Sequence, residues 1–305
     1  MEQPPKKAEH WKITGEMPEV FLEVRTKILE KFENKTDGLN IERVKKFMKE
    51  NSLPILEYVL YDTEDLSRLD EMLEGLDELE PTTIAEYKST FNLIFLKRNR
   101  KYEELNESIY DEGNLIHELG HGSTQHMHYA QKAKTDQLKV TRTGFALRNV
   151  KLKKEKTPWG EFLEEAFAEM LSGEYTERNR SETTQKKIKE KMESLIREDD
   201  DWQYDMAEKY VSIYDINERG NLTVGYSIPA VAATGLEMLC EKIPTLRQTL
   251  IEARSDVEKL REIPKLINAI KPGLYMEIQK CDYSHEEFLR VQNIIKEAIQ
   301  NLEEK

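Results

Sequence analysis

The stretch Asn114-Leu115-Ile116-His117-Glu118-Leu119-Gly120-His121 contains the pattern His-Glu-x-x-His and is expected to be helical. In a helix, His117 and His121 lie one turn apart on one face, where both imidazoles can bind one metal ion. Glu118, the next residue around the helix, can reach a water molecule beside the metal without being a ligand. The pattern therefore predicts a catalytic zinc site in which Glu118 is the general base.

The residues that flank the motif indicate a packed helix rather than a solvated one. Glu118 is the only Asp, Glu, Lys or Arg from Asn114 to Gln125, although these residue types make up 34% of the chain. A solvated helix would carry more charge on its outer face. We expect the helix to begin near Ser108 or Asp111, where acidic residues suit the positive end of the helix dipole.

A second helix can supply the third protein ligand that a catalytic zinc needs. In the helix expected over residues 159–171, Glu161, Glu165 and Glu169 follow one another at a spacing of four. Like charges at this spacing repel one another, and apolar residues border the same stripe, so these glutamates are costly without a cation. We therefore expect Glu165 to be the third zinc ligand and Glu169 to accept a hydrogen bond from the free ring N–H of His117.

The two segments together resemble the gluzincin zinc metallopeptidases, including their small bacterial and viral members, the minigluzincins. The resemblance lies in His117-Glu118-Leu119-Gly120-His121 and in Leu163-Glu164-Glu165-Ala166-Phe167-Ala168-Glu169. It covers residues 105–175 well and residues 222–275 weakly. It implies a zincin-like catalytic core that hydrolyses peptide bonds.

The resemblance also bears on single residues of the site. It implies Glu165 as the ligand and Glu169 as the acid that orients the first histidine. Glu164 stands where many members carry asparagine, which leaves Glu164 as a rival for the ligand role. Tyr226, at the start of a segment similar to the tyrosine-bearing helix of many gluzincins, is the candidate donor to the oxyanion of peptide hydrolysis. Its alternative role is that of a core tyrosine with a satisfied hydroxyl.

A different zincin pattern, that of the metzincins, does not fit this chain. It requires a glycine three residues after the second histidine and a third histidine three residues later, and the chain has Thr124 and Met127 at these positions. His126 and His128 miss that register and are expected to line the site or to contact its ligands. Tyr129 and His126 are weaker candidates for the oxyanion donor.

Composition narrows the class of protein. The 305 residues suffice for one large domain or two small ones. A formal net charge of −13 argues against a general binder of nucleic acid or of anionic membranes. Cys240 and Cys281 are the only cysteines, which favours a reducing compartment, although the two could pair. The polar N-terminus and the lack of a long apolar run predict a cytoplasmic protein with neither signal peptide nor membrane span.

We expect a zinc-dependent metallopeptidase that acts on a peptide or protein substrate. One alternative is a regulatory zinc protease that cleaves a specific protein partner such as a repressor, a class that the segment Glu165-Ala166-Phe167-Ala168-Glu169-Met170-Leu171 also resembles. Another is a non-catalytic helical interaction protein with a vestigial or structural zinc site. A purely structural site needs no general base and is closed by four protein ligands, so Glu118 favours the enzyme.

The expected fold class is α+β, mainly helical, with a small sheet beside the two active-site helices. We expect this sheet to include residues 90–96 and 140–152. Four parts are expected along the chain: a flexible tail at 1–15, a helical N-terminal region at 16–89, a zincin-like metal-binding core at 90–175 and a helical C-terminal subdomain at 176–305.

Local signals predict further elements. The apolar spacing is helical from Pro18 to about Glu78, and Pro81 is expected to start another helix. Gly173 is expected to end the second active-site helix. The segment Gly225-Tyr226-Ser227-Ile228-Pro229 is expected to open an apolar helix, and residues 284–305 to form a terminal amphipathic one.

Overall fold

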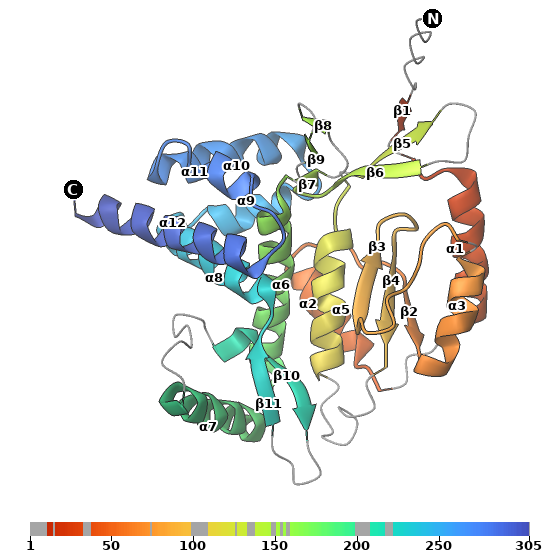
Figure 1. Cartoon of the computed structure of the whole chain (residues 1–305), viewed down its shortest axis with the longest axis horizontal. Coiled ribbons are helices and arrows are strands. Elements are labelled where there is room, and N and C mark those ends of the chain that lie inside the picture. Colours follow the sequence, from red (N-terminus) through yellow and green to blue (C-terminus); the bar gives the residue numbers. More distant parts are fainter. Residues whose placement is uncertain are drawn as a thin grey trace, which may run out of the picture.

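A three-stranded sheet supports the first of the two histidine- and glutamate-bearing helices (Figure 1). Its strands lie in the order β2 (Tyr58–Tyr61), β4 (Leu93–Lys97) and β3 (Ala85–Lys88). β2 runs parallel to β4, and β3 runs antiparallel to it. β2 and β4 are almost wholly apolar because both faces of these strands are buried.

The computed structural model describes residues 11–14, 16–32, 38–73, 75–98, 109–125, 127–132, 138–147, 151–152, 155–156, 159–198, 208–216 and 222–304. The described chain is mainly helical with several small sheets, as the expected α+β class requires. No described helix is long and apolar enough to cross a membrane.

Each face of the sheet is covered by helices. α1 (Glu19–Phe32) and α3 (Leu66–Met72) share one apolar cluster with alternate residues of the strands, including Val59 and Phe95. The intervening strand residues point to the other face, where α2 (Ile41–Glu50) and α5 (Ile109–Gly122) join the larger core. Alternation of side chains along each strand therefore divides the interior into two clusters.

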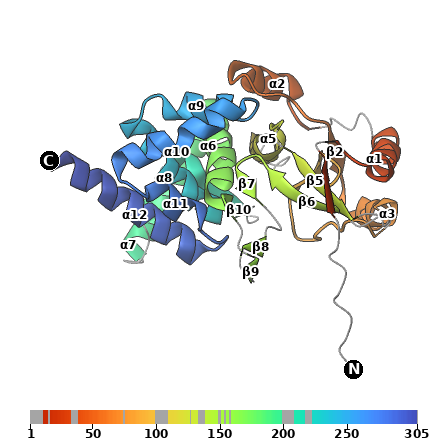
Figure 2. The ribbon, with the colours of Figure 1, turned by 90° about the horizontal axis from the view of Figure 1, so that it is seen from above.

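α5 lies between the sheet and α6 (Glu161–Asn179), as the two views agree (Figures 1 and 2). The two helices approach closely at Gly120. A Cβ atom added there would lie 2.8 Å from the Cα atom of Ala168, so a side chain at this position would displace the backbone of α6. Gly120 and Ala168 therefore set the distance between the two helices, and with it the distance between their facing side chains.

A partly buried ion pair connects α2 to these two helices. Arg43 donates through Nη2 to Glu112 Oε2 at 2.7 Å, and the Glu112 side chain is fully buried on α5. The hydroxyl of Tyr175 on α6 donates to the same carboxylate. The N-terminal part of the chain is thus tied to both helices at one charged group.

The far side of α6 is covered by C-terminal helices (Figure 2). α8 (Ile228–Lys242) packs on α6 and is in turn covered by α12 (His285–Glu303). Three shorter helices complete this part: α9 (Leu246–Glu252), α10 (Val257–Ile270) and α11 (Leu274–Gln279). α8 begins as expected, since the Ser227 side chain caps it by accepting from the Ala230 N–H.

The remaining elements are small sheets and one charged helix. A four-stranded sheet has the order β1 (Trp11–Thr14), β5 (His128–Lys132), β6 (Leu138–Thr143) and β7 (Ala146–Leu147). Two hairpins pair β8 (Lys151–Leu152) with β9 (Glu155–Lys156) and β10 (Val211–Ile216) with β11 (Leu222–Tyr226). The charged helix is α7 (Glu182–Glu198), and two short 3₁₀ turns span Thr63–Asp65 and Glu208–Tyr210.

Several sequence-based predictions of local structure are wrong. No helix follows Pro81, because residues 85–88 pair with β4 as a strand. The helical pattern predicted up to Glu78 is interrupted by β2, whose apolar run is short enough to suit a buried strand as well as a helix. Residues 90–96 and 140–152 do not share one sheet, since β4 pairs with β2 and β3 whereas β6 pairs with β5 and β7.

Two other boundaries differ from expectation. Residues 11–14, placed in the flexible tail, form a strand that pairs with β5. α6 continues through Gly173 to Asn179. The ring of Tyr210 packs against this glycine, and a Cβ atom added at Gly173 would lie 2.5 Å from that ring. Gly173 therefore allows the close contact with Tyr210 and does not end the helix.

Gly120→Ala is expected to lower the free energy of unfolding by about 1–3 kcal/mol, because the new methyl group meets backbone that cannot rotate away. Gly113→Ala on the same helix is the matched control, since its Cβ atom would meet the Thr176 hydroxyl, which can rotate. Urea unfolding of both variants measures the difference. Equal stability of the two variants would contradict the close helix contact.

Candidate metal centre

Three side chains from α5 and α6 converge on one point. Nε2 of His117 and Nε2 of His121 are 3.1 Å apart, and each lies 3.6 Å from Oε2 of Glu165. The spacing of the histidines by four places both on the face of α5 that α6 covers. His121 and Glu165 are buried and His117 is nearly so.

The donor set and its spacing fit a zinc ion. Two imidazole nitrogens and one carboxylate oxygen are zinc ligands, and tetrahedral ligands about 2.0–2.1 Å from zinc lie about 3.3 Å from one another. The three ligand atoms here all lie within 4.8 Å of one another, and their separations bracket that value. Three protein ligands leave one position of a tetrahedral site open, as in catalytic rather than structural zinc sites.

Each histidine has a carboxylate partner on its other ring nitrogen. Nδ1 of His117 lies 2.8 Å from Oε2 of Glu169, the contact expected from the sequence. Nδ1 of His121 lies 3.3 Å from Oε1 of Glu164. A carboxylate accepts but does not donate, so these contacts place a proton on Nδ1 of each ring and direct Nε2 of each ring toward Glu165.

The geometry favours Glu165 over Glu164 as the third ligand. Glu164 is fully buried and directed away from the converging ligand atoms. It accepts from the Phe145 N–H at 2.8 Å and from the guanidinium of Arg254. Burial raises the pKa of the Glu164 carboxyl, but the charges and hydrogen bonds of Arg254 and His121 together outweigh it and hold this pKa at about 2.

The electrostatics of the cluster favour a bound cation. Burial lowers the pKa of both histidines, but the surrounding carboxylates outweigh it and raise the pKa of His117 well above its usual range and that of His121 to about 9. Burial raises the pKa of Glu165, but His121 and His117 lower it further than burial raises it. Positive charge at this position is therefore strongly stabilised.

Glu118 lies between α5 and the edge of the sheet. Its Oε2 atom accepts the N–H of Tyr87 on β3 at 2.7 Å. It is not one of the three converging ligands. This hydrogen bond holds the carboxylate at the outer edge of β3.

The other residues considered from the sequence have mixed outcomes. The side chain of Tyr226 and all of His126 lie outside the described residues, so their roles stay predictions. His128 is exposed on β5. Tyr129 is buried, and its hydroxyl donates to the Ser89 carbonyl, as for a core tyrosine.

Tyr283 is a further candidate residue that sequence reasoning missed. It precedes α12, and its ring packs edge-on against Phe288 with centroids 5.5 Å apart. Partial burial and then the nearby carboxylates of Glu165 and Glu169 raise the pKa of Tyr283, so its hydroxyl keeps its proton. The side chain remains 51% exposed. The sequence around Tyr283 gives no signal, because more than a hundred residues separate it from α6.

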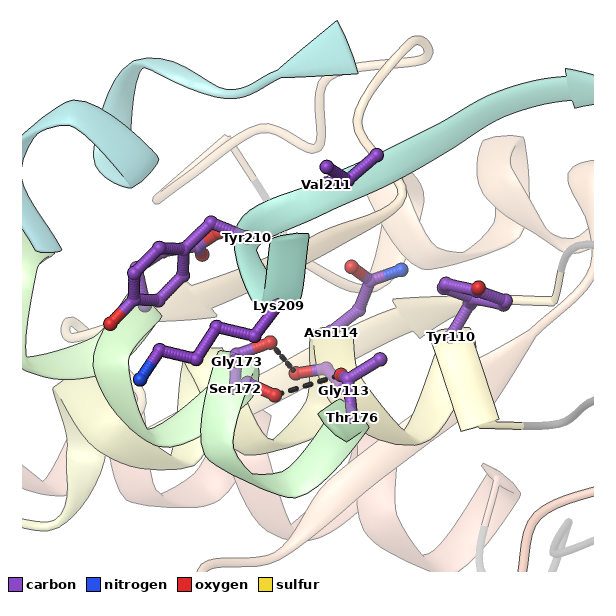
Figure 3. Close-up of a pocket in the computed structure, with 10 residues that line it drawn as sticks. Tyr110, Gly113, Asn114, Ser172, Gly173, Thr176, Lys209, Tyr210 and Val211 are labelled. Carbon is purple, nitrogen blue, oxygen red and sulfur yellow. Dashed lines mark hydrogen bonds between the residues drawn. The ribbon is translucent and has the colours of Figure 1, made fainter. Parts of the chain in front are cut away.

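A small polar recess with a cavity volume of about 40 Å³ lies beside the cluster (Figure 3). Glu169, which contacts His117, is among its lining residues. Figure 3 shows that Tyr110, Gly113 and Asn114 of α5 face Ser172, Gly173 and Thr176 of α6, with Lys209, Tyr210 and Val211 on the opposite side.

In comparisons with family models, with curated proteins and with solved structures, none matches this chain.

Proposed function

We propose that this protein is a zinc-dependent metallopeptidase of the gluzincin type, with a zincin-like core formed by α5, α6 and the β2–β4–β3 sheet. The observation that carries the proposal is the convergence of His117, His121 and Glu165, with Glu118 beside them but outside the ligand set. A structural zinc site would need neither an open position nor a neighbouring carboxylate. Zinc, when bound, supplies a Lewis acid that polarises a carbonyl and makes water more acidic.

Glu118 is the general base of the proposed reaction. Its Oε2 atom is held by the Tyr87 N–H, which leaves Oε1 to accept a proton from the attacking water. The same carboxyl then passes this proton to the nitrogen of the cleaved amide. His117 and His121 keep their Nδ1 protons throughout, because Glu169 and Glu164 hold them.

The edge of β3 supports a peptide as the substrate. The Lys97 N–H donates to the Ile84 carbonyl, so the polar groups of residues 84, 86 and 88 face β4. Those of Ala85 and Tyr87 face outward, as the Tyr87–Glu118 contact requires. None of the described strands pairs with this outer edge. An extended peptide can add a strand there and so bring an amide beside Glu118.

Glu118→Gln is expected to lower kcat for peptide hydrolysis by about 10²–10⁴-fold, because glutamine cannot take the proton. The variant should keep the zinc content of the wild type, since Glu118 is not a ligand. Hydrolysis of casein and of a library of unstructured peptides, followed by mass spectrometry, measures the loss. Undiminished cleavage by Glu118→Gln would rule out this assignment, and a metal-loaded wild type that cleaves nothing would favour a non-catalytic role.

Tyr283→Phe is expected to lower kcat by about 10²–10³-fold with little change in KM, if its hydroxyl donates to the developing oxyanion. Tyr226→Phe, measured in parallel, tests the tyrosine favoured by the sequence. Tyr275→Phe on α11 is the control for loss of a hydroxyl in the same region. A loss confined to Tyr226→Phe would return the role to Tyr226.

A further inference from the structure

Arg254 is a deeply buried cation that the proposed reaction does not use. It lies between α9 and α10 with 1% of its surface exposed. Its guanidinium lies 4.9 Å from the ring centroid of Phe145 and 5.1 Å from that of Phe167. Burial of a guanidinium is costly unless specific partners compensate it.

The first partner is Glu164. Arg254 donates from Nη1 to Oε2 at 2.7 Å and from Nη2 to Oε1 at 2.9 Å, a two-pronged contact. Glu164 also accepts from the Phe145 N–H and from Nδ1 of His121. A carboxylate offers about four acceptor positions, so these contacts leave Glu164 none for a metal ion.

The backbone leaves room for this pair at Gly144. Its φ of +54° is one that side-chain-bearing residues rarely adopt. A Cβ atom there would lie 2.2 Å from Nη1 of Arg254 and 2.5 Å from Oε2 of Glu164. The turn between β6 and β7 is therefore shaped around the contact between these two side chains.

The second partner of Arg254 is the end of α5. Nη2 donates to the His121 carbonyl at 2.7 Å and also to the Gly120 carbonyl. Carbonyls in the last turn of a helix lack partners within the helix, and a cation is favoured there by the helix dipole. Arg254 thus contacts the backbone of His121 directly, and it contacts the ring of His121 indirectly, through Glu164.

We propose that Arg254 is a positioning residue of the metal centre, which clamps Glu164 as the hydrogen-bond acceptor of His121 and keeps that carboxylate out of the ligand set. Of the two adjacent glutamates, Glu165 is then the one left to bind metal. The inference rests on the proposed function only in requiring that His117, His121 and Glu165 bind a metal ion. It does not require that the protein cleave peptides.

Three variants separate positioning from a purely structural ion pair. Glu164→Gln keeps an acceptor for His121 together with Arg254. Glu164→Gln combined with Arg254→Met, the glutamine pair, keeps the acceptor but removes the clamp. Glu164→Leu combined with Arg254→Met, the leucine pair, removes both. Neither pair leaves a buried unpaired charge, and replacement of a buried ion pair by uncharged residues is often tolerated.

The zinc dissociation constant, measured by competition with a chromophoric chelator, is the primary readout. Contacts to the outer nitrogen of a ligating histidine typically contribute 10–100-fold to metal affinity. We expect the glutamine pair to bind zinc about tenfold more weakly than Glu164→Gln, and the leucine pair about tenfold more weakly again. The visible absorption of bound Co²⁺ should change in the same order, because it reports ligand geometry.

Near-ultraviolet circular dichroism establishes that each variant is folded before metal is added. Equal zinc affinity and equal Co²⁺ spectra in all three folded variants would overturn the inference and leave the proposed function intact. Weaker zinc binding in the leucine pair alone would show that Glu164 orients His121 without help from Arg254, and would overturn the proposed role of Arg254. Failure of the wild type to bind zinc would overturn both proposals.

If the paired variants do not fold, Arg254→Lys serves instead. Lysine keeps the charge but cannot form the two-pronged contact with Glu164. We expect this variant, once shown to be folded by near-ultraviolet circular dichroism, to bind zinc more weakly than the wild type. Unchanged zinc affinity would overturn the inference.

Discussion

The close approach of α5 and α6 is the constraint on which the candidate site depends. At Gly120 the helix backbones come so near that a single Cβ atom would meet the backbone of Ala168. This contact places the two histidines of α5 against Glu165 of α6. It also buries Glu164 and Glu165 side by side, and Glu164 is paired with Arg254. The packing that forms the core therefore creates an unbalanced negative charge, which a divalent cation would offset.

Much of the candidate site could be predicted from the sequence because its geometry is local. Residues four apart on a helix share a face, so His117 and His121 had to lie together once α5 was recognised. The same periodicity placed Glu165 and Glu169 on one side of α6. Their contacts with the histidines were expected because a catalytic zinc site needs a third ligand, and because each ligating histidine needs an acceptor for its other ring N–H.

The parts that could not be predicted depend on contacts between distant segments. Arg254 meets Glu164 across ninety residues of chain, and nothing in its neighbouring sequence marks it as a partner. Tyr283, which directly precedes Ser284 and α12, was missed for the same reason. The sheet was misread because the apolar run at β2 suits a helix or a strand equally, and the pairing with β4 decides between them.

The most direct test of the central claim is the zinc content of the purified protein, measured by plasma mass spectrometry without a metal-affinity column. The account predicts about one zinc per chain in the wild type and in Glu164→Gln, and none in Glu165→Ala, because only Glu165 joins the two histidines as a ligand. Zinc absent from the wild type, and not taken up on addition, would contradict the account. So would zinc lost with Glu164→Gln but retained with Glu165→Ala.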